Sequence, residues 1–212
     1  MSRRLPVYLL IDTSGSMRGE PIEAVKVGIE SLVATLRQDP AALDSVHLCL
    51  MTFDRDAKVI SPLTPLENFQ TPTGLIVEDG PTHLGLALDK MCELVDTDVM
   101  PSTDSRKGDW RPLLFVLTDG AANDKLDFKN AVPKIKSKGF AAIVGCAAGA
   151  KGKKDELAQF CTSVVVLDTL DSSGFQSFFK WVTTSVAQGN HSAGVTEDLE
   201  LPPPPPEVRI QI

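Results

Sequence analysis

The sequence has no long apolar run and no excess of basic residues. None of its apolar stretches reaches the roughly 18 residues that a membrane-spanning helix needs. The apolar run after Arg3 and Arg4 is short and lacks a cleavage-like site before Asp12, so we expect no signal peptide. The 21 Lys and Arg against 28 Asp and Glu give a net charge of −7, which argues against a nucleic-acid surface. We therefore expect neither a membrane nor a nucleic acid as a partner.

Cysteine is also scarce. None of the four cysteines forms a C-x-x-C pair, which leaves no short-range metal or redox motif of that type. Cys49 and Cys146 lie inside apolar runs, and Cys92 falls on the apolar face of a predicted helix. We therefore expect buried free thiols, and we predict a cytoplasmic protein.

The pattern of apolar residues alternates between strands and helices. The chain has 212 residues, 42% hydrophobic and 23% charged, which is typical of one globular domain. The predicted strands are 5–11, 46–53, 58–63, 112–117, 140–147 and 163–167, and helices are predicted at about 127–138 and 153–160. Three further helices are marked by apolar faces: Ile22, Val25, Ile29, Leu32, Val33 and Leu36; Leu84, Leu88, Met91 and Val95; and Phe175, Phe178, Phe179, Val182 and Val186.

This alternation predicts an α/β fold: a doubly wound, mostly parallel six-stranded sheet with helices on both faces. One strand breaks the parallel pattern. Only the turn Asp54-Arg55-Asp56 separates strand 46–53 from strand 58–63, which is too short for a crossover. The strand at about 58–63 is therefore predicted to be an antiparallel edge strand.

The composition changes after Gln188. Residues 189–201 are polar, and residues 202–206 are five consecutive prolines, which favour a stiff polyproline segment. We therefore predict a domain at 1–188 and a tail at 189–212. Two interpretations of the tail remain open: a solvated extension, or a tethered strand in which Val208, Ile210 and Ile212 add to a sheet edge in this molecule or a partner.

A group of oxygen-bearing side chains follows the first predicted strand. Asp12, Ser14 and Ser16 alternate along a loop, so an extended backbone aims all three side chains the same way. Hard cations such as Mg²⁺ prefer such oxygen donors. A helix N-cap is the alternative interpretation, but a cap needs one such residue and not three in phase.

Two more groups are predicted to reach the same place. Ligands of open parallel sheets bind outside the carboxyl ends of the strands. The apolar strand 112–117 ends at Thr118 and Asp119, and the loop Gly80-Pro81-Thr82 enters a helix and supplies another hydroxyl. We therefore predict one metal site formed by Asp12, Ser14, Ser16, Thr82 and Asp119.

The motifs Asp12-Thr13-Ser14-Gly15-Ser16-Met17, Gly80-x-Thr82 and Leu117-Thr118-Asp119-Gly120 resemble the metal-ion-dependent adhesion site of the von Willebrand factor A family. The resemblance covers roughly residues 5–188. It implies that Ser14, Ser16 and Thr82 are direct ligands of Mg²⁺, with Mn²⁺ or Ca²⁺ as alternatives, and that Asp12 and Asp119 act mainly through bound water. The segment Ala121-Ala122-Asn123 departs from many relatives, and we expect it to alter the rim of the site but not its ligands.

Three hydroxyl ligands would leave the ion electrophilic, so its natural further ligand is an Asp or Glu carboxylate of a partner protein. Catalysis would need a nucleophile or a general base that is not already committed to the metal, and we identify none. The chain is therefore predicted to be a protein-interaction module and not an enzyme.

A Mg²⁺-dependent phosphate-handling enzyme is the alternative function. Haloacid-dehalogenase-type enzymes place two acids, two positions apart, after the first strand. In this chain Ser14 replaces the second acid. Residues 147–154 are similar to a phosphate-binding loop but lack its first glycine and end in Lys154, where a Ser or Thr is needed. His83 is predicted to start a helix, and His47 lies in a strand.

Among members of the family, the chain resembles the bacterial TerY-type proteins of tellurium-resistance and stress-response operons. That resemblance implies a signalling module and a partner that is a kinase or a phosphatase of the same operon.

Overall fold

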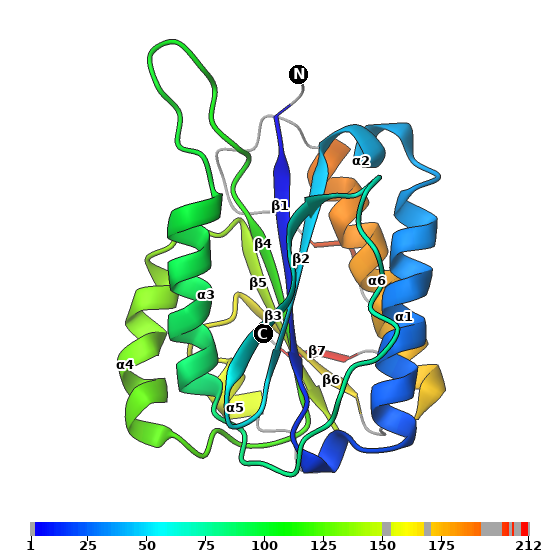
Figure 1. Cartoon of the computed structure of the whole chain (residues 1–212), viewed down its shortest axis with the longest axis vertical. Helices are drawn as coiled ribbons and strands as arrows, with labels where there is room; N and C mark the ends of the chain where they lie inside the picture. The colour runs from blue at the N-terminus through cyan, green and yellow to red at the C-terminus, as the bar shows by residue number, and fades with distance from the viewer. Residues whose placement is uncertain are drawn as a thin grey trace.

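A twisted sheet forms the central layer of the protein (Figure 1). The computed structural model describes residues 3–149, 154–167, 171–191, 201–203, 205 and 209–211. In these residues the sheet has the order β3-β2-β1-β4-β5-β6-β7. Its strands are β1 (Leu5–Asp12), β2 (Val46–Phe53), β3 (Ala57–Pro65), β4 (Leu113–Thr118), β5 (Ala142–Ala148), β6 (Ser163–Leu167) and β7 (Arg209–Gln211).

The predicted fold class is confirmed. Strands β1, β2, β4, β5 and β6 run parallel, and β3 pairs antiparallel with β2 at one edge. The strand predicted at 58–63 is therefore the antiparallel edge strand, although it extends to Ala57–Pro65. The tail adds β7 to the other edge, which raises the total from the six strands of the domain to seven.

Helices cover both faces of the sheet (Figure 1). One face carries α1 (Glu20–Leu36), α2 (Pro40–Ser45) and α6 (Ser172–His191), and the other carries α3 (Leu84–Asp98), α4 (Lys125–Lys136) and α5 (Lys154–Leu157). None of the described helices is both long enough and apolar enough to cross a membrane.

Alternation along the strands divides the interior into two apolar layers. In β1, Val7, Leu9 and Ile11 pack under α1 and α6, whereas Tyr8 and Leu10 pack under α3 and α4. The apolar faces predicted for α1, α3 and α6 are buried in these layers. The structure confirms buried free thiols at Cys49, Cys92 and Cys146, and Cys161 is a partly exposed free thiol.

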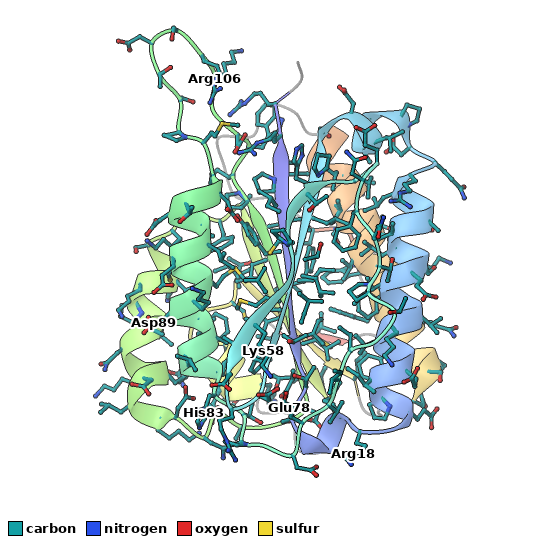
Figure 2. All side chains as sticks on the ribbon, in the orientation of Figure 1. Arg18, Lys58, Glu78, His83, Asp89 and Arg106 are labelled. Carbon is teal, nitrogen blue, oxygen red and sulfur yellow. The ribbon has the colours of Figure 1, made fainter. Side chains whose placement is uncertain are left out.

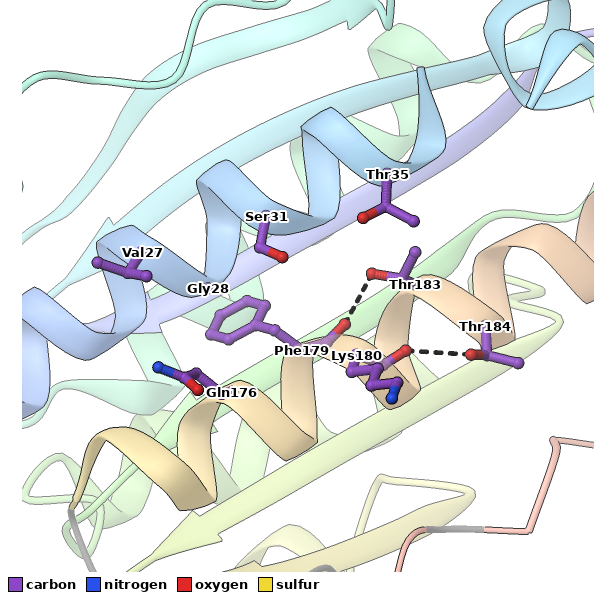
Figure 3. A pocket seen from close by; sticks show the side chains of 9 residues that line it. All are labelled: Val27, Gly28, Ser31, Thr35, Gln176, Phe179, Lys180, Thr183 and Thr184. Carbon is purple, nitrogen blue, oxygen red and sulfur yellow. Dashed lines mark hydrogen bonds between the residues drawn. The ribbon is translucent and has the colours of Figure 1, made fainter. Parts of the chain in front are cut away.

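Helices α1 and α6 approach each other closely at Gly28. A Cβ atom at this position would lie 2.1 Å from a ring carbon of Phe179, so only glycine allows the contact. Figure 3 shows the phenyl ring of Phe179 against α1, beside a surface groove of about 480 Å³ between the two helices. The groove is lined by Val27, Gly28, Ser31, Thr35, Gln176, Phe179, Lys180, Thr183 and Thr184, none of which belongs to the predicted metal site.

The tail returns to the domain. Helix α6 continues to His191, past the boundary predicted at 188. Beyond it, Leu201 packs against the apolar layer under α1 and α6, and the buried indole N–H of Trp181 donates a hydrogen bond to the Pro202 carbonyl at 2.9 Å. Strand β7 then pairs antiparallel with β6, so the tail strand adds to the edge of its own sheet. The predicted edge residues Val208 and Ile212 lie outside the described residues.

Some local elements differ from the prediction. Helix α2 was not predicted from the sequence, although Pro40 occupies its first turn and Asp39 caps it by accepting from the Ala41 N–H at 2.9 Å. The helix predicted at 153–160 is shorter, Lys154–Leu157. Residues 150–153, the central part of the segment 147–154 that is similar to a phosphate-binding loop, lie outside the described residues.

Candidate metal centre

Strands β1 and β4 bring the two predicted acids to the same edge. They are parallel neighbours with Ile11 opposite Leu117, so Asp12 is the last residue of β1 and Asp119 directly follows the last residue of β4 at the same edge. After β1 the chain forms a short 3₁₀ helix, Gly15–Met17. Ser14 occupies its N-cap position, but the Ser14 side chain makes no capping hydrogen bond. The N-cap interpretation of these hydroxyls is therefore not supported.

Hydrogen bonds connect four of the five predicted residues in two short series. Asp12 Oδ1 accepts from the Ser14 backbone N–H at 2.8 Å, and Asp12 Oδ2 accepts from the Thr118 hydroxyl at 2.6 Å. Ser16 Oγ donates to Asp119 Oδ1 at 2.7 Å and lies 3.3 Å from Ser14 Oγ. The two carboxylates and the two serine hydroxyls thus form one polar cluster.

Thr82 reaches this cluster from a third segment, the loop before α3. Its hydroxyl lies beside Gly120, where a Cβ atom would come within 3.2 Å of Thr82 Oγ1. Gly120 directly follows Asp119, so the Thr82 side chain lies close to the Asp119 loop at a position that carries no side chain. The structure therefore brings together all five residues that the sequence analysis predicted for the site.

Most of the cluster is removed from water. Asp12, Ser14, Thr82 and Asp119 are between 0% and 6% exposed, whereas Ser16 is exposed. Burial raises the pKa of Asp12 to about 6, and the nearby Asp119 charge adds to this increase. Hydrogen bonds from Thr118 and Ser14 oppose it, because they favour the ionised carboxylate.

The donor set is chemically specific. Among the described residues, no three His, Cys, Asp or Glu side chains lie close enough together to hold a metal. The cluster instead offers neutral hydroxyl oxygens backed by two carboxylates, all of which are hard donors that suit Mg²⁺, Mn²⁺ or Ca²⁺ better than soft metals. The residues present thus fit a hard divalent cation.

The residues that hold the loops of the site were not predicted from the sequence. Asn123 Oδ1 accepts from the Thr82 N–H at 2.7 Å, and Asp124 and Glu156 accept from other backbone N–H groups of the same region. Asp54, which is 2% exposed, accepts from the Thr13 hydroxyl at 3.1 Å. These bonds join groups that are distant in sequence, so no local motif marks them.

The rim of the site carries both acidic and basic side chains. Figure 2 shows His83, Glu78 and Arg18 at the end of the molecule that holds the cluster, and Arg106 at the opposite end. Arg18 forms an exposed ion pair with Asp79 at 2.8 Å. His83 occupies the N-cap position of α3, and its Nδ1 lies 2.9 Å from the Arg55 carbonyl. The prediction that His83 starts a helix is confirmed.

Comparison with known proteins gives a match to one family. The sequence profile of the von Willebrand factor type A domain matches residues 7–179. An uncharacterized protein of Synechocystis sp. is 31% identical over 124 residues, which cover 56% of this chain and 26% of that protein. The match thus spans about a quarter of the length of this curated relative.

Solved structures share the fold at low identity. Proximal thread matrix protein 1 from the mussel byssus, in a structure with a zinc-occupied metal-ion-dependent adhesion motif, has a TM-score of 0.63 and 18% identity. The likeness covers 88% of this chain and 48% of that one. The pilus adhesin SpaC of Lactobacillus rhamnosus GG has a TM-score of 0.69 at 12% identity, covering 87% of this chain and 30% of that one.

Proposed function

The chain belongs to the von Willebrand factor type A domain family, and we propose that it is a metal-dependent protein-interaction module. One observation carries this proposal: hydroxyls and carboxylates from three separate segments meet at the carboxyl edge of the sheet, and most of them are buried. Placing two carboxylates out of water in close proximity is unfavourable unless a cation compensates them.

The residues of the site would hold one divalent ion. Ser14, Ser16 and Thr82 would bind it directly, while Asp12 and Asp119 would act mainly through water and orient the hydroxyls. Mg²⁺ is the ion we propose, with Mn²⁺ or Ca²⁺ as alternatives. The zinc in the corresponding motif of the mussel protein supports a divalent ion but not its identity.

A bound ion would supply an electrophilic position for a partner. Neutral hydroxyls leave much of the charge of the ion uncompensated, so the ligand that best completes its coordination is an anionic oxygen. We propose that a partner protein provides an Asp or Glu side chain for this purpose. Ser16 is exposed at the cluster, which supports access from solvent.

The alternative is a Mg²⁺-dependent phosphate-handling enzyme. An enzyme would need a nucleophile or a general base beside the ion. The Thr118 hydroxyl donates to Asp12, and His83 Nδ1 is engaged by the Arg55 carbonyl. We therefore place interaction ahead of catalysis. Metal-dependent hydrolysis of a phosphoester or a nucleotide by the purified protein would reverse that order.

The cellular setting belongs to the proposal as well. The resemblance to TerY-type proteins supports a cytoplasmic role in a bacterial tellurium-resistance or stress-response system, with a kinase or phosphatase of the same operon as the partner. We also propose that residues 1–188 are the interaction domain and that the tail, residues 189–212, contributes to recruitment of the partner or to self-association.

A pull-down from lysate with and without Mg²⁺ tests the proposed function. Wild type should capture a partner only when Mg²⁺ is present, and Asp12→Ala should capture none under either condition. A competing acidic peptide should release the captured partner. Equal capture by wild type and Asp12→Ala would show that the interaction does not use this site.

A further inference from the structure

Asn123 joins the loop that carries Thr82 to the loop that carries Asp119. The Thr82 N–H donates to Asn123 Oδ1 at 2.7 Å, and the Asn123 N–H donates to the Thr82 carbonyl at 2.8 Å. Neither loop can slide or rotate relative to the other without breaking one of these two reciprocal bonds. Asn123 therefore fixes both the separation and the orientation of the two loops.

The segment that contains Asn123, residues 120–125, is also held from two other directions. Asp124 accepts from the N–H groups of Gly85 and Leu86, at 3.2 and 2.9 Å, in the first turn of α3. Glu156 of α5 accepts from the Ala122 N–H at 2.8 Å. Helices α3 and α5 thus anchor this segment on either side of Asn123.

Helix α3 also packs closely against the start of α4. A Cβ atom at Gly85 would lie 2.1 Å from the Phe128 backbone nitrogen, so the start of α3 lies directly against the start of α4. Asp124 is also the N-cap residue of α4. Because Thr82 lies in the loop just before the N-cap residue of α3 and Asp119 directly follows β4, residues 120–125 determine how far the Thr82 hydroxyl stands from the Asp119 loop.

We propose that Asn123 is a positioning residue for the metal site. This inference rests on the proposed function, since Asn123 acts on the ion only through Thr82. Asn123 itself is exposed, whereas Thr82 is 6% exposed and belongs to the buried cluster. Loss of the Asn123 side chain should therefore change the site much more than it changes the fold.

Three variants separate these effects in calorimetric titrations with Mg²⁺ and Mn²⁺. Asn123→Ala should weaken binding about tenfold, the effect typical of residues that orient metal ligands. Asn123→Asp keeps an oxygen that can accept from the Thr82 N–H, so its affinity should return toward that of wild type. Asn130→Ala, at an exposed position on α4, is the matched control and should bind as wild type.

Amide hydrogen exchange of the metal-free protein provides a second measurement. The Thr82 N–H should exchange faster in Asn123→Ala than in wild type, and Asn123→Asp should restore its protection. Wild-type metal affinity in Asn123→Ala, or unchanged exchange at Thr82, would overturn the positioning role while leaving the proposed function intact. Absence of metal binding by wild type would overturn both.

Discussion

The carboxyl edge of the sheet and the C-terminal tail both join segments that are distant in sequence, but they are held in different ways. At the edge, Asp12, Ser16 and Asp119 belong to a cluster of hydrogen bonds between side chains that is largely buried. The tail is held by the packing of Leu201, one hydrogen bond from Trp181, and the short pairing of β7 with β6.

The polar groups at the carboxyl edge are arranged for a ligand, whereas the contacts of the tail only dock that segment on the domain. Burying Asp12 and Asp119 side by side opposes folding, as the raised pKa of Asp12 indicates. The tail buries proline and leucine and pairs its backbone, which favours docking without any further component. We therefore expect a bound cation to stabilise the carboxyl edge strongly and to have almost no effect on the docking of the tail.

The largest effect should come from the acid at the end of β1. Asp12→Asn preserves size and can still bond to Ser14 and Thr118, but it removes the charge. Asp12→Asn should weaken Mg²⁺ binding by roughly 100-fold, whereas Thr82→Val should weaken it by roughly tenfold. The acid should matter more because it both compensates the charge of the ion and orients the loop. Calorimetric titration measures both variants. A greater loss in Thr82→Val than in Asp12→Asn would contradict the proposed role of the acid.

Metal should stabilise the fold through this edge alone. Mg²⁺ at 100 times its Kd should add about 2.7 kcal/mol to the free energy of unfolding, which corresponds to a rise in Tm of roughly 5–10 °C for a domain of this size. The metal-free Asp12→Asn protein should melt no lower than metal-free wild type, because a buried charge has been removed. Thermal denaturation with Mg²⁺ and with chelator tests this, and an equal Mg²⁺-dependent rise in Asp12→Asn would locate the ion elsewhere.

Removing the tail should have a smaller effect. Deletion of residues 202–212 removes the Pro202 carbonyl and β7, so Tm should fall by only a few degrees, roughly 2–4 °C, while Mg²⁺ affinity stays unchanged. Association with a partner or with a second copy should weaken. Deletion of residues 206–212 is the matched control, since it removes β7 but keeps the bond from Trp181. A large loss of stability would show that the tail belongs to the domain core.

The smallest effect is expected for the reactivity of the cysteine thiols in the apolar layers beneath both regions. Burial raises the pKa of the Cys92 thiol to about 11 and that of Cys49 to about 12, and it raises the pKa of Cys146 and Cys161 as well. Few reactive thiolates are therefore present at pH 8. Iodoacetamide should label the native protein far more slowly than the urea-unfolded protein, and deletion of residues 202–212 should not change the native rate. Mass spectrometry measures the labelling. Rapid labelling of the native protein would show that the interior opens.

The sequence predicted the carboxyl edge well because its residues follow a rule of parallel sheets. Asp12 and Asp119 each come directly after a strongly apolar strand, and adjacent parallel strands end at the same edge. The apolar faces of α1, α3 and α6 were equally clear, because one face of each helix has to be buried over several turns.

Other features could not be predicted from local patterns. Asn123 and Glu156 accept hydrogen bonds from backbone groups 41 and 34 residues away, and any asparagine or glutamate in a loop has the same local signature. The edge on which β7 docks was also undetermined, because alternating apolar residues at 208–212 suit any open strand. The helix α2 was missed even though Asp39 and Pro40 are typical of a helix start.

The central claim is that one divalent ion binds among Ser14, Ser16 and Thr82. Anomalous diffraction from crystals grown with Mn²⁺ tests this most directly, because it locates the ion without reference to affinity or stability. We expect one strong anomalous peak among these three hydroxyls in wild type and none at that position in Asp12→Asn. A peak elsewhere in the molecule, or no peak at this edge of the sheet in wild type, would contradict the account.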